Sequence, residues 1–202
     1  WWIAVPRTSP VEPGFTVGPD SLLSGPQWIG AMKTMVIGLG NPILTDDGVG
    51  IYAARMLERV LPPGSGVDIV ELAVGGLGLM EAMIGYDRVI LIDALWSPDG
   101  EPGRVLQFDA GHLPDTLNSA SAHDADLPTA LRVGRSLGAP LPADDSIQIV
   151  AVQARDVLTF GQVPTPPVAA ALPLAVSRVL DLLDCRPVVD PYTLSPESFW
   201  RL

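Results

Sequence analysis

The chain has 202 residues, of which 48% are hydrophobic and 17% are charged, and its formal net charge is −11. This length and composition suit one globular domain with a sizeable core and exclude an intrinsically disordered protein. The negative charge disfavours a nucleic acid as partner, because binding to phosphates requires a basic face.

The chain contains one cysteine, Cys185, which excludes an internal disulfide framework and a structural zinc site built on cysteines. No apolar run approaches the length of a membrane-spanning helix, and no segment resembles a signal peptide. These features predict a cytoplasmic protein that does not bind membranes. No histidine is near Cys185 in the sequence, so we interpret it as a packed thiol and not as a nucleophile.

Residues 1–31 differ from the rest of the chain, because frequent prolines interrupt any helical or strand pattern. We expect them to be a non-native or disordered leader and exclude them from the fold prediction. The remainder divides into one domain at residues 32–185 and a C-terminal tail at residues 186–202. Phe199 and Trp200 are the residues of this tail that we consider for docking on the domain.

Strand-like and helix-like patterns alternate through the domain. Apolar runs predict strands at about residues 35–38, 67–72, 88–93, 104–108 and 146–152, the fourth of them at a sheet edge. Apolar residues at helical spacing predict helices at about residues 49–60, 80–84, 126–137 and 167–183. Continuous apolar strands are buried on both faces, as in a parallel sheet. We therefore predict one α/β domain of three layers, with a mostly parallel, twisted sheet and helices on both faces.

The segment GLGNPILTDDGVG, residues 38–50, follows the first predicted strand, and ligand sites in such sheets form at the carboxyl ends of strands. A dinucleotide-binding fingerprint requires a third glycine where this chain has Ile43, and no lysine follows to complete a Walker loop. Asp46 and Asp47 would also repel a pyrophosphate. We therefore exclude phosphate binding at this segment.

The adjacent acids Asp46 and Asp47 allow two interpretations. An acid just before a helix is commonly its N-cap, but only one of two neighbours can take that position. The other aspartate would then lie near the carboxyl ends of the strands, where it is a candidate to contact a ligand. From these residues alone, both interpretations stay open.

Asp93 and His123 are the other candidate site residues. Asp93 ends the strand predicted at residues 88–93, where a side chain is either exposed at the rim of the sheet or caps the next turn. His123 precedes a predicted helix, and His112, the other histidine of the chain, serves as an internal control. Two carboxylates and one imidazole form a ligand set suited to a divalent transition metal. The sequence alone does not show that these side chains converge.

These motifs resemble those of the [NiFe]-hydrogenase maturation endopeptidases. The similarity begins with residues 38–50 and continues, in order, through GGLG (75–78), GYDRVILIDA (85–94) and SAHD (121–124). It covers about residues 35–184. Members of that family remove a C-terminal extension from the precursor of the hydrogenase large subunit once nickel is in place, and the bound nickel serves as their recognition mark.

The resemblance implies that Asp47, Asp93 and His123 contact the nickel and act in catalysis. Asp47 is the second acid of a pair that is Asp-Glu in some members, so its shorter arm changes the reach toward the metal and keeps the charge. The metal would either polarise the scissile carbonyl or lower the pKa of a bound water. Because the nickel arrives within the substrate, the free enzyme is expected to hold no tightly bound metal. The role of Asp46, as a cap or as a base, stays open.

Two other functions share part of the pattern. Peptidyl-tRNA hydrolases also begin with a strand followed by Gly-Leu-Gly-Asn-Pro, but they continue with Thr-Arg-His-Asn where this chain has Asp46 and Asp47. A chaperone that binds nickel and the precursor without cleaving it is the alternative that lacks catalysis.

We expect the enzyme to be a monomer.

We expect the loops after Gly38, Leu72 and Asp93 to lie at one edge of the sheet, because parallel strands end there together. We also expect an apolar or mixed surface beside this edge, since a large precursor must dock there. Its candidates, each of which is either exposed or tucked beneath the loops, are Leu39, Ile43, Leu44, Leu77 and Leu79.

Overall fold

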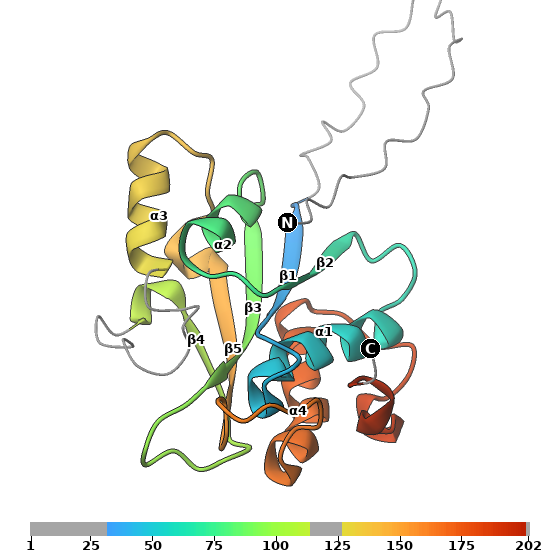
Figure 1. The fold of residues 1–202 in the computed structure, drawn as a ribbon. Helices are drawn as coiled ribbons and strands as arrows, with labels where there is room; N and C mark the ends of the chain where they lie inside the picture. Colours follow the sequence, from blue (N-terminus) through green and yellow to red (C-terminus); the bar gives the residue numbers. More distant parts are fainter. Residues whose placement is uncertain (1–31, 114–126, 201–202) are drawn as a thin grey trace, which may run out of the picture. The chain divides into compact units, whose positions relative to one another are not determined.

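The computed structural model describes residues 32–113 and 127–200 (Figure 1). Its strands are β1 (Thr34–Leu39), β2 (Val67–Leu72), β3 (Arg88–Leu95), β4 (Val105–Asp109) and β5 (Ile147–Gln153). Its helices are α1 (Val49–Val60), α2 (Gly76–Ala82), α3 (Leu127–Ser136) and α4 (Pro166–Leu182). Short 3-10 helices are η1 (Thr45–Gly48), η2 (Ala110–His112), η3 (Asp144–Ser146), η4 (Pro191–Thr193) and η5 (Pro196–Ser198). The predicted leader at residues 1–31 lies outside the described residues.

The strands form one sheet in the order β2-β1-β3-β5-β4. The first four of these run parallel, and β4 pairs antiparallel with β5 at the edge. Helices α1 and α4 cover one face of the sheet, and α2 and α3 cover the other (Figure 1). The predicted α/β fold of three layers with a mostly parallel sheet is therefore confirmed. Among the helices of the described ranges, none has the length and apolar character needed to cross a membrane.

The register of the sheet aligns the carboxyl ends of its parallel strands. Leu39 at the end of β1 pairs with Leu72 at the end of β2, and Gly38 pairs with Ile92 of β3. Farther along β3, Asp93 pairs with Ala151 of β5. The expected common edge for the loops after β1, β2 and β3 is thus confirmed, and we call it the carboxyl edge.

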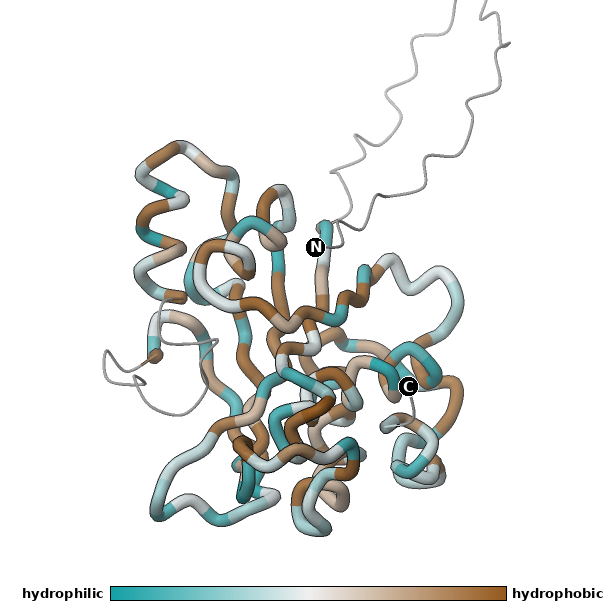
Figure 2. Tube along the Cα trace, viewed as in Figure 1, coloured by the Kyte–Doolittle hydropathy of each residue, from teal (hydrophilic) through white to brown (hydrophobic). Residues whose placement is uncertain are grey.

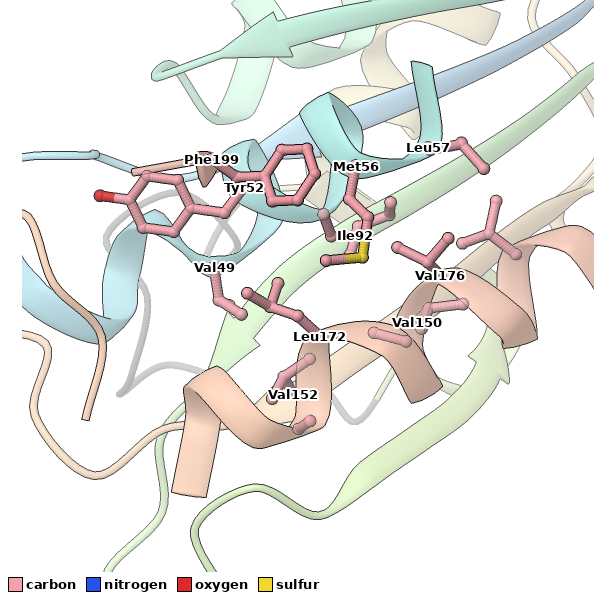
Figure 3. Close-up of a cluster of buried hydrophobic side chains, with 14 of the residues drawn as sticks. Val49, Tyr52, Met56, Leu57, Ile92, Val150, Val152, Leu172, Val176 and Phe199 are labelled. Carbon is pink, nitrogen blue, oxygen red and sulfur yellow. The ribbon is translucent and has the colours of Figure 1, made fainter. Parts of the chain in front are cut away.

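Strand β3 divides its side chains between two cores, because successive residues of a strand face opposite sides of the sheet. Ile90 and Ile92 enter the core beneath α1 and α4, whereas Val89 and Leu91 enter the core beneath α2 and α3. Figure 2 shows hydrophobic residues concentrated along the central strands. Figure 3 shows the first core, in which Met56 of α1 and side chains of α4 and the sheet point toward one another.

The segment that follows α4 packs on α1. Phe199 and Trp200 are buried in the core beneath α1 and α4, and the ring of Trp200 meets that of Tyr52 edge-on, with ring centroids 6.0 Å apart. The amide of Val188 donates to the carbonyl of Val60 at 2.8 Å. Arg55 donates to the carbonyl of Phe199 at 3.0 Å. Residues 186–200 therefore complete this core.

Candidate functional site

The turn after β1 requires glycine at position 40. Gly40 has a φ of +138°, which side-chain-bearing residues rarely adopt, and a Cβ there would collide with the carbonyl oxygen of Asp47. The Gly40 amide donates to the carbonyl of Leu72 at 3.0 Å, which ties the turn to the end of β2. The turn consequently folds back over η1, the short helix that carries Asp46 and Asp47.

Gly50 brings the start of α1 against β3. A Cβ at this position would collide with the carbonyl oxygens of Leu39 and Ile92. Helix η1 directly precedes α1 and also packs against β3. The close approach therefore places Asp47 and Asp93 at the same edge of the sheet, from two different elements.

Asp47 is 5% exposed and is fixed within its own turn. Its Oδ2 accepts a hydrogen bond from the amide of Asn41 at 2.9 Å, and its amide donates to the carbonyl of Leu44 at 2.8 Å. The N-cap of α1 is Gly48, and no side chain caps it. The interpretation that one of the two aspartates caps this helix is therefore wrong.

Asp46 is fully buried and binds the connection between β5 and α4 instead. Its carboxylate accepts hydrogen bonds from the amides of Arg155 and Asp156, both at 2.9 Å. It also accepts from the amide of Thr165 at 2.6 Å and from the hydroxyl of Thr165 at 2.9 Å. Four donors on one buried carboxylate make Asp46 a cross-link between two loops and leave it unsuited to the role of general base.

Further bonds join the same two loops. The amide of Thr45 donates to the carbonyl of Gly161 at 2.7 Å, and the amide of Gly161 donates to the carbonyl of Ile43 at 3.0 Å. The hydroxyl of Tyr52, on α1, lies 2.9 Å from the carbonyl oxygens of both Pro42 and Gln162. Burial raises the pKa of Tyr52 above its ordinary value, so the phenol stays neutral and donates.

Asp93 lies inside β3 and is 3% exposed. The expectation that it ends the strand at an exposed rim is wrong, because β3 continues to Leu95 and Leu95 pairs with Gln153. The Oδ1 of Asp93 accepts a hydrogen bond from the amide of Ala94 at 2.7 Å. Alternation along the strand places the Asp93 side chain on the face that carries Leu91, toward α2 and α3.

A narrow cavity of about 10 Å³ lies beside Asp93, and its other walls are mostly apolar. This volume is about that needed for one water molecule. Leu113 and Leu127, the described residues on either side of the 114–126 segment, both line the cavity. His123 belongs to that segment and lies outside the described residues, so its predicted approach to Asp47 and Asp93 stays a prediction.

The control histidine, His112, belongs to a different part of the molecule. Its exposed ring lies 2.7 Å from the carboxylate of Asp109, and this hydrogen bond holds the pKa of Asp109 below its usual range. Asp109 pairs with Gln148 near the start of β5, which is the opposite end of the sheet from the carboxyl edge. Within residues 32–113 and 127–200, no three His, Cys, Asp or Glu side chains are placed to hold a metal ion.

The apolar candidates for docking separate into two groups. Leu39 and Leu79 are fully buried, so they belong to the core, and Leu44 is partly buried. Ile43 and Leu77 are exposed, at 44% and 56%. An exposed apolar surface at the carboxyl edge is therefore present, but it uses only part of the predicted set.

Residues 51–182 match the sequence model of a family described as Hydrogenase maturation protease. The chain belongs to this family. The Hydrogenase 2 maturation protease of Escherichia coli K12 is 32% identical over 107 residues, which cover 50% of this chain and 64% of that relative. The resemblance inferred from the motifs, and with it the assignment to a family of enzymes, is confirmed.

Solved structures agree with the family assignment. The hydrogenase maturating endopeptidase HybD from E. coli has a TM-score of 0.66 and 28% identity, over 78% of this chain and 98% of that one. The [NiFe] hydrogenase maturation protease HybD from Thermococcus kodakarensis shares the fold, with a TM-score of 0.56 and 23% identity over 75% of this chain and 99% of that one. These hydrogenase maturation proteases therefore share the three-layer architecture described above.

The sequence prediction missed the part played by the β5–α4 connection. Thr165, Arg155 and Asp156 carry no motif, and they are more than 100 residues from Asp46 in the chain. No sequence signal was available for these contacts, because three of the four donors to Asp46 are backbone amides.

Proposed function

We propose that this chain is an endopeptidase that removes the C-terminal extension of a nickel-loaded [NiFe]-hydrogenase large-subunit precursor. The family match carries the proposal, because the relatives are named as hydrogenase maturation proteases. The carboxyl edge supports it, since two buried carboxylates from separate elements, Asp47 and Asp93, lie there together.

The nickel of the precursor would be held by Asp47, Asp93 and His123. Two carboxylates and one imidazole suit a divalent transition metal and leave coordination positions open. Leu127, four residues after His123, borders the Asp93 cavity, and four residues of chain span at most about 14 Å. Such a reach is compatible with the approach of the imidazole to Asp93.

The metal is part of the substrate in this proposal and supplies Lewis-acid chemistry at the scissile bond. The chain's own contribution is to fix the ligands in place. Asn41 holds Asp47 through its amide, and Ala94 holds Asp93 in the same way. Asp46 keeps the turn that carries Asp47 attached to the β5–α4 connection and takes no part in proton transfer.

Incubation of the full chain with a nickel-loaded large-subunit precursor tests the proposal. The expected result is a loss of mass from the C-terminus of the precursor, seen by intact-mass spectrometry. The same precursor without nickel is the control and should keep its mass. Stable binding without any mass loss would contradict the proposal and would favour the non-cleaving chaperone.

A further inference from the structure

Three loops at the carboxyl edge contain no charged residue, although the chain has 35 of them. Together with the adjoining end of β1 and the start of α2, these loops span residues 38–45, 73–80 and 157–165. They instead expose large apolar side chains, which are Ile43, Val74, Leu77, Leu158, Phe160 and Val163. Exposed apolar side chains gathered at one edge of a molecule are typical of an interaction site.

The loop at residues 157–163 is the most exposed of the three. Leu158 is 84% exposed and Phe160 is 80% exposed, so neither side chain is used to hold the fold together. The backbone of the loop is nevertheless ordered by Asp156, whose carboxylate accepts from the amides of Leu158 at 3.1 Å and Thr159 at 2.9 Å. The loop therefore presents its apolar side chains from a defined backbone.

Hydrogen bonds connect this loop directly to the turn that carries Asp47. Gly161 exchanges backbone hydrogen bonds with Ile43 and Thr45, so exposed Ile43 lies next to the loop. Asp46, the neighbour of Asp47, binds Thr165 at the far end of the same connection. A partner that docks on the loop is consequently held at a fixed distance from Asp47. We call Ile43, Leu158, Phe160 and Val163 the loop surface.

The chemistry of the loop surface defines the partner that fits it. Contact between an uncharged, apolar surface and another apolar surface is favourable, because both are removed from water. Such a surface offers no ion pair, so a charged group that is buried against it loses its hydration without compensation. A strongly charged peptide or a nucleic acid therefore fits poorly. An uncharged, apolar stretch of a polypeptide fits well.

We propose that the loop surface docks an apolar, uncharged segment of the hydrogenase large-subunit precursor. This inference rests on the proposed function, and it assigns precursor recognition to the β5–α4 loop. Docking there positions the precursor beside Asp47 through the bonds that join Thr45 to Gly161 and Asp46 to Thr165.

The test compares Leu158→Asp and Phe160→Asp with Leu137→Asp. Leu137 is 81% exposed and follows α3 at the opposite end of the sheet, so it is a matched control for adding a charge at an exposed apolar position. For each variant, the dissociation constant of the nickel-loaded precursor and the kcat and KM of processing are measured. Leu158→Asp and Phe160→Asp should each raise the dissociation constant and KM by about tenfold or more, which is typical of a central interface residue, and leave kcat unchanged. Leu137→Asp should change none of the three values.

Several outcomes would overturn the docking proposal. Unchanged affinity in both loop variants, or an equal loss in Leu137→Asp, would show that the loop surface is not the docking site. A concentration-dependent dimer of the wild-type chain that Phe160→Asp abolishes would assign the surface to a second copy of the chain. Binding of the precursor without cleavage, weakened only by the loop variants, would support docking and contradict the proposed protease function.

Discussion

Asp46 and Asp47 are neighbours in the chain, but they hold different partners. Asp46 accepts four hydrogen bonds from Arg155, Asp156 and Thr165, whereas Asp47 accepts from Asn41 within its own turn. Removal of the two carboxylates should therefore have different effects. Loss of the Asp46 carboxylate should mainly lower stability, whereas loss of the Asp47 carboxylate should mainly lower activity.

Asp46→Ala should lower the free energy of unfolding by about 3 kcal/mol or more, because buried donors that lose a charged acceptor are left without partners. Asp47→Asn should change stability little, since the amide oxygen still accepts from Asn41, but it should abolish processing because a carboxylate is lost. Urea unfolding and intact-mass analysis of the precursor measure the two effects. An Asp46→Ala variant as stable as the wild type would contradict the cross-link.

Asp93→Asn should abolish processing while the fold is kept, because asparagine preserves the volume of this buried side chain. Alanine is a poorer test here, since it would enlarge the cavity beside Asp93 and lower stability as well.

His123→Ala should also abolish processing, and His112→Ala should leave the rate unchanged because His112 lies exposed at the opposite end of the sheet. Processing by His123→Ala at the wild-type rate would remove that residue from the site.

The sequence identified Asp47 and Asp93 as site candidates but could not assign the role of Asp46. Asp93 was recognisable because it follows an uninterrupted apolar run, although the end of β3 was placed two residues too early. The partners of Asp46 could not be predicted, because they lie 109 to 119 residues away and three of the four donors are backbone amides. Backbone donors carry no signature of residue type.

At the scale of secondary-structure elements, helix α1 organises the site from beneath. Its first turn packs on β3 through Gly50, and its Tyr52 hydroxyl reaches both the β1–η1 turn and the β5–α4 connection. One element thus contacts both loops that Asp46 joins. Local pattern predicted α1 well, since the apolar stripe and the Pro62-Pro63 stop depend on adjacent residues, but it did not predict these contacts across the chain.

Tyr52→Phe should destabilise the protein by about 1 kcal/mol at neutral pH, because a hydrogen bond is lost while the ring remains packed. The variant should also change the response to alkali. Burial raises the pKa of Tyr52, so the unfolded chain ionises first, and this stabilisation is present below pH about 10 and is lost as the pH rises through the folded-state pKa. Denaturant unfolding between pH 8 and 11 should show a smaller loss of stability for Tyr52→Phe than for the wild type. If the free energy of unfolding changed with pH in the same way for both proteins, this account would be refuted.

At the scale of the whole described domain, the core beneath α1 and α4 combines residues from both ends of the sequence range. Val36 of β1 belongs to it, and so do Phe199 and Trp200. The three-layer order could be predicted from the sequence, because strand-like and helix-like apolar segments alternate. The contribution of residues 186–200 could not be predicted, because they form only short 3-10 helices and show no periodic pattern.

Phe199→Ala should lower the free energy of unfolding by about 3–5 kcal/mol, as expected for a buried aromatic side chain. Phe160→Ala is the matched control, because that ring is exposed and its removal leaves no cavity. Thermal or denaturant unfolding of both variants measures the difference. Equal stabilities would mean that residues 186–200 contribute little to the core.

The burial of Phe199 and Trp200 also has a consequence for the order of events during synthesis. The five strands and helices α1 to α4 are all translated before these two residues. Tyr52 and the neighbouring surface of α1 therefore stay uncovered by the aromatic pair until residue 200 has been synthesised and has left the ribosomal exit tunnel. This core is completed last, and α1 is available to other chains and to chaperones before that point.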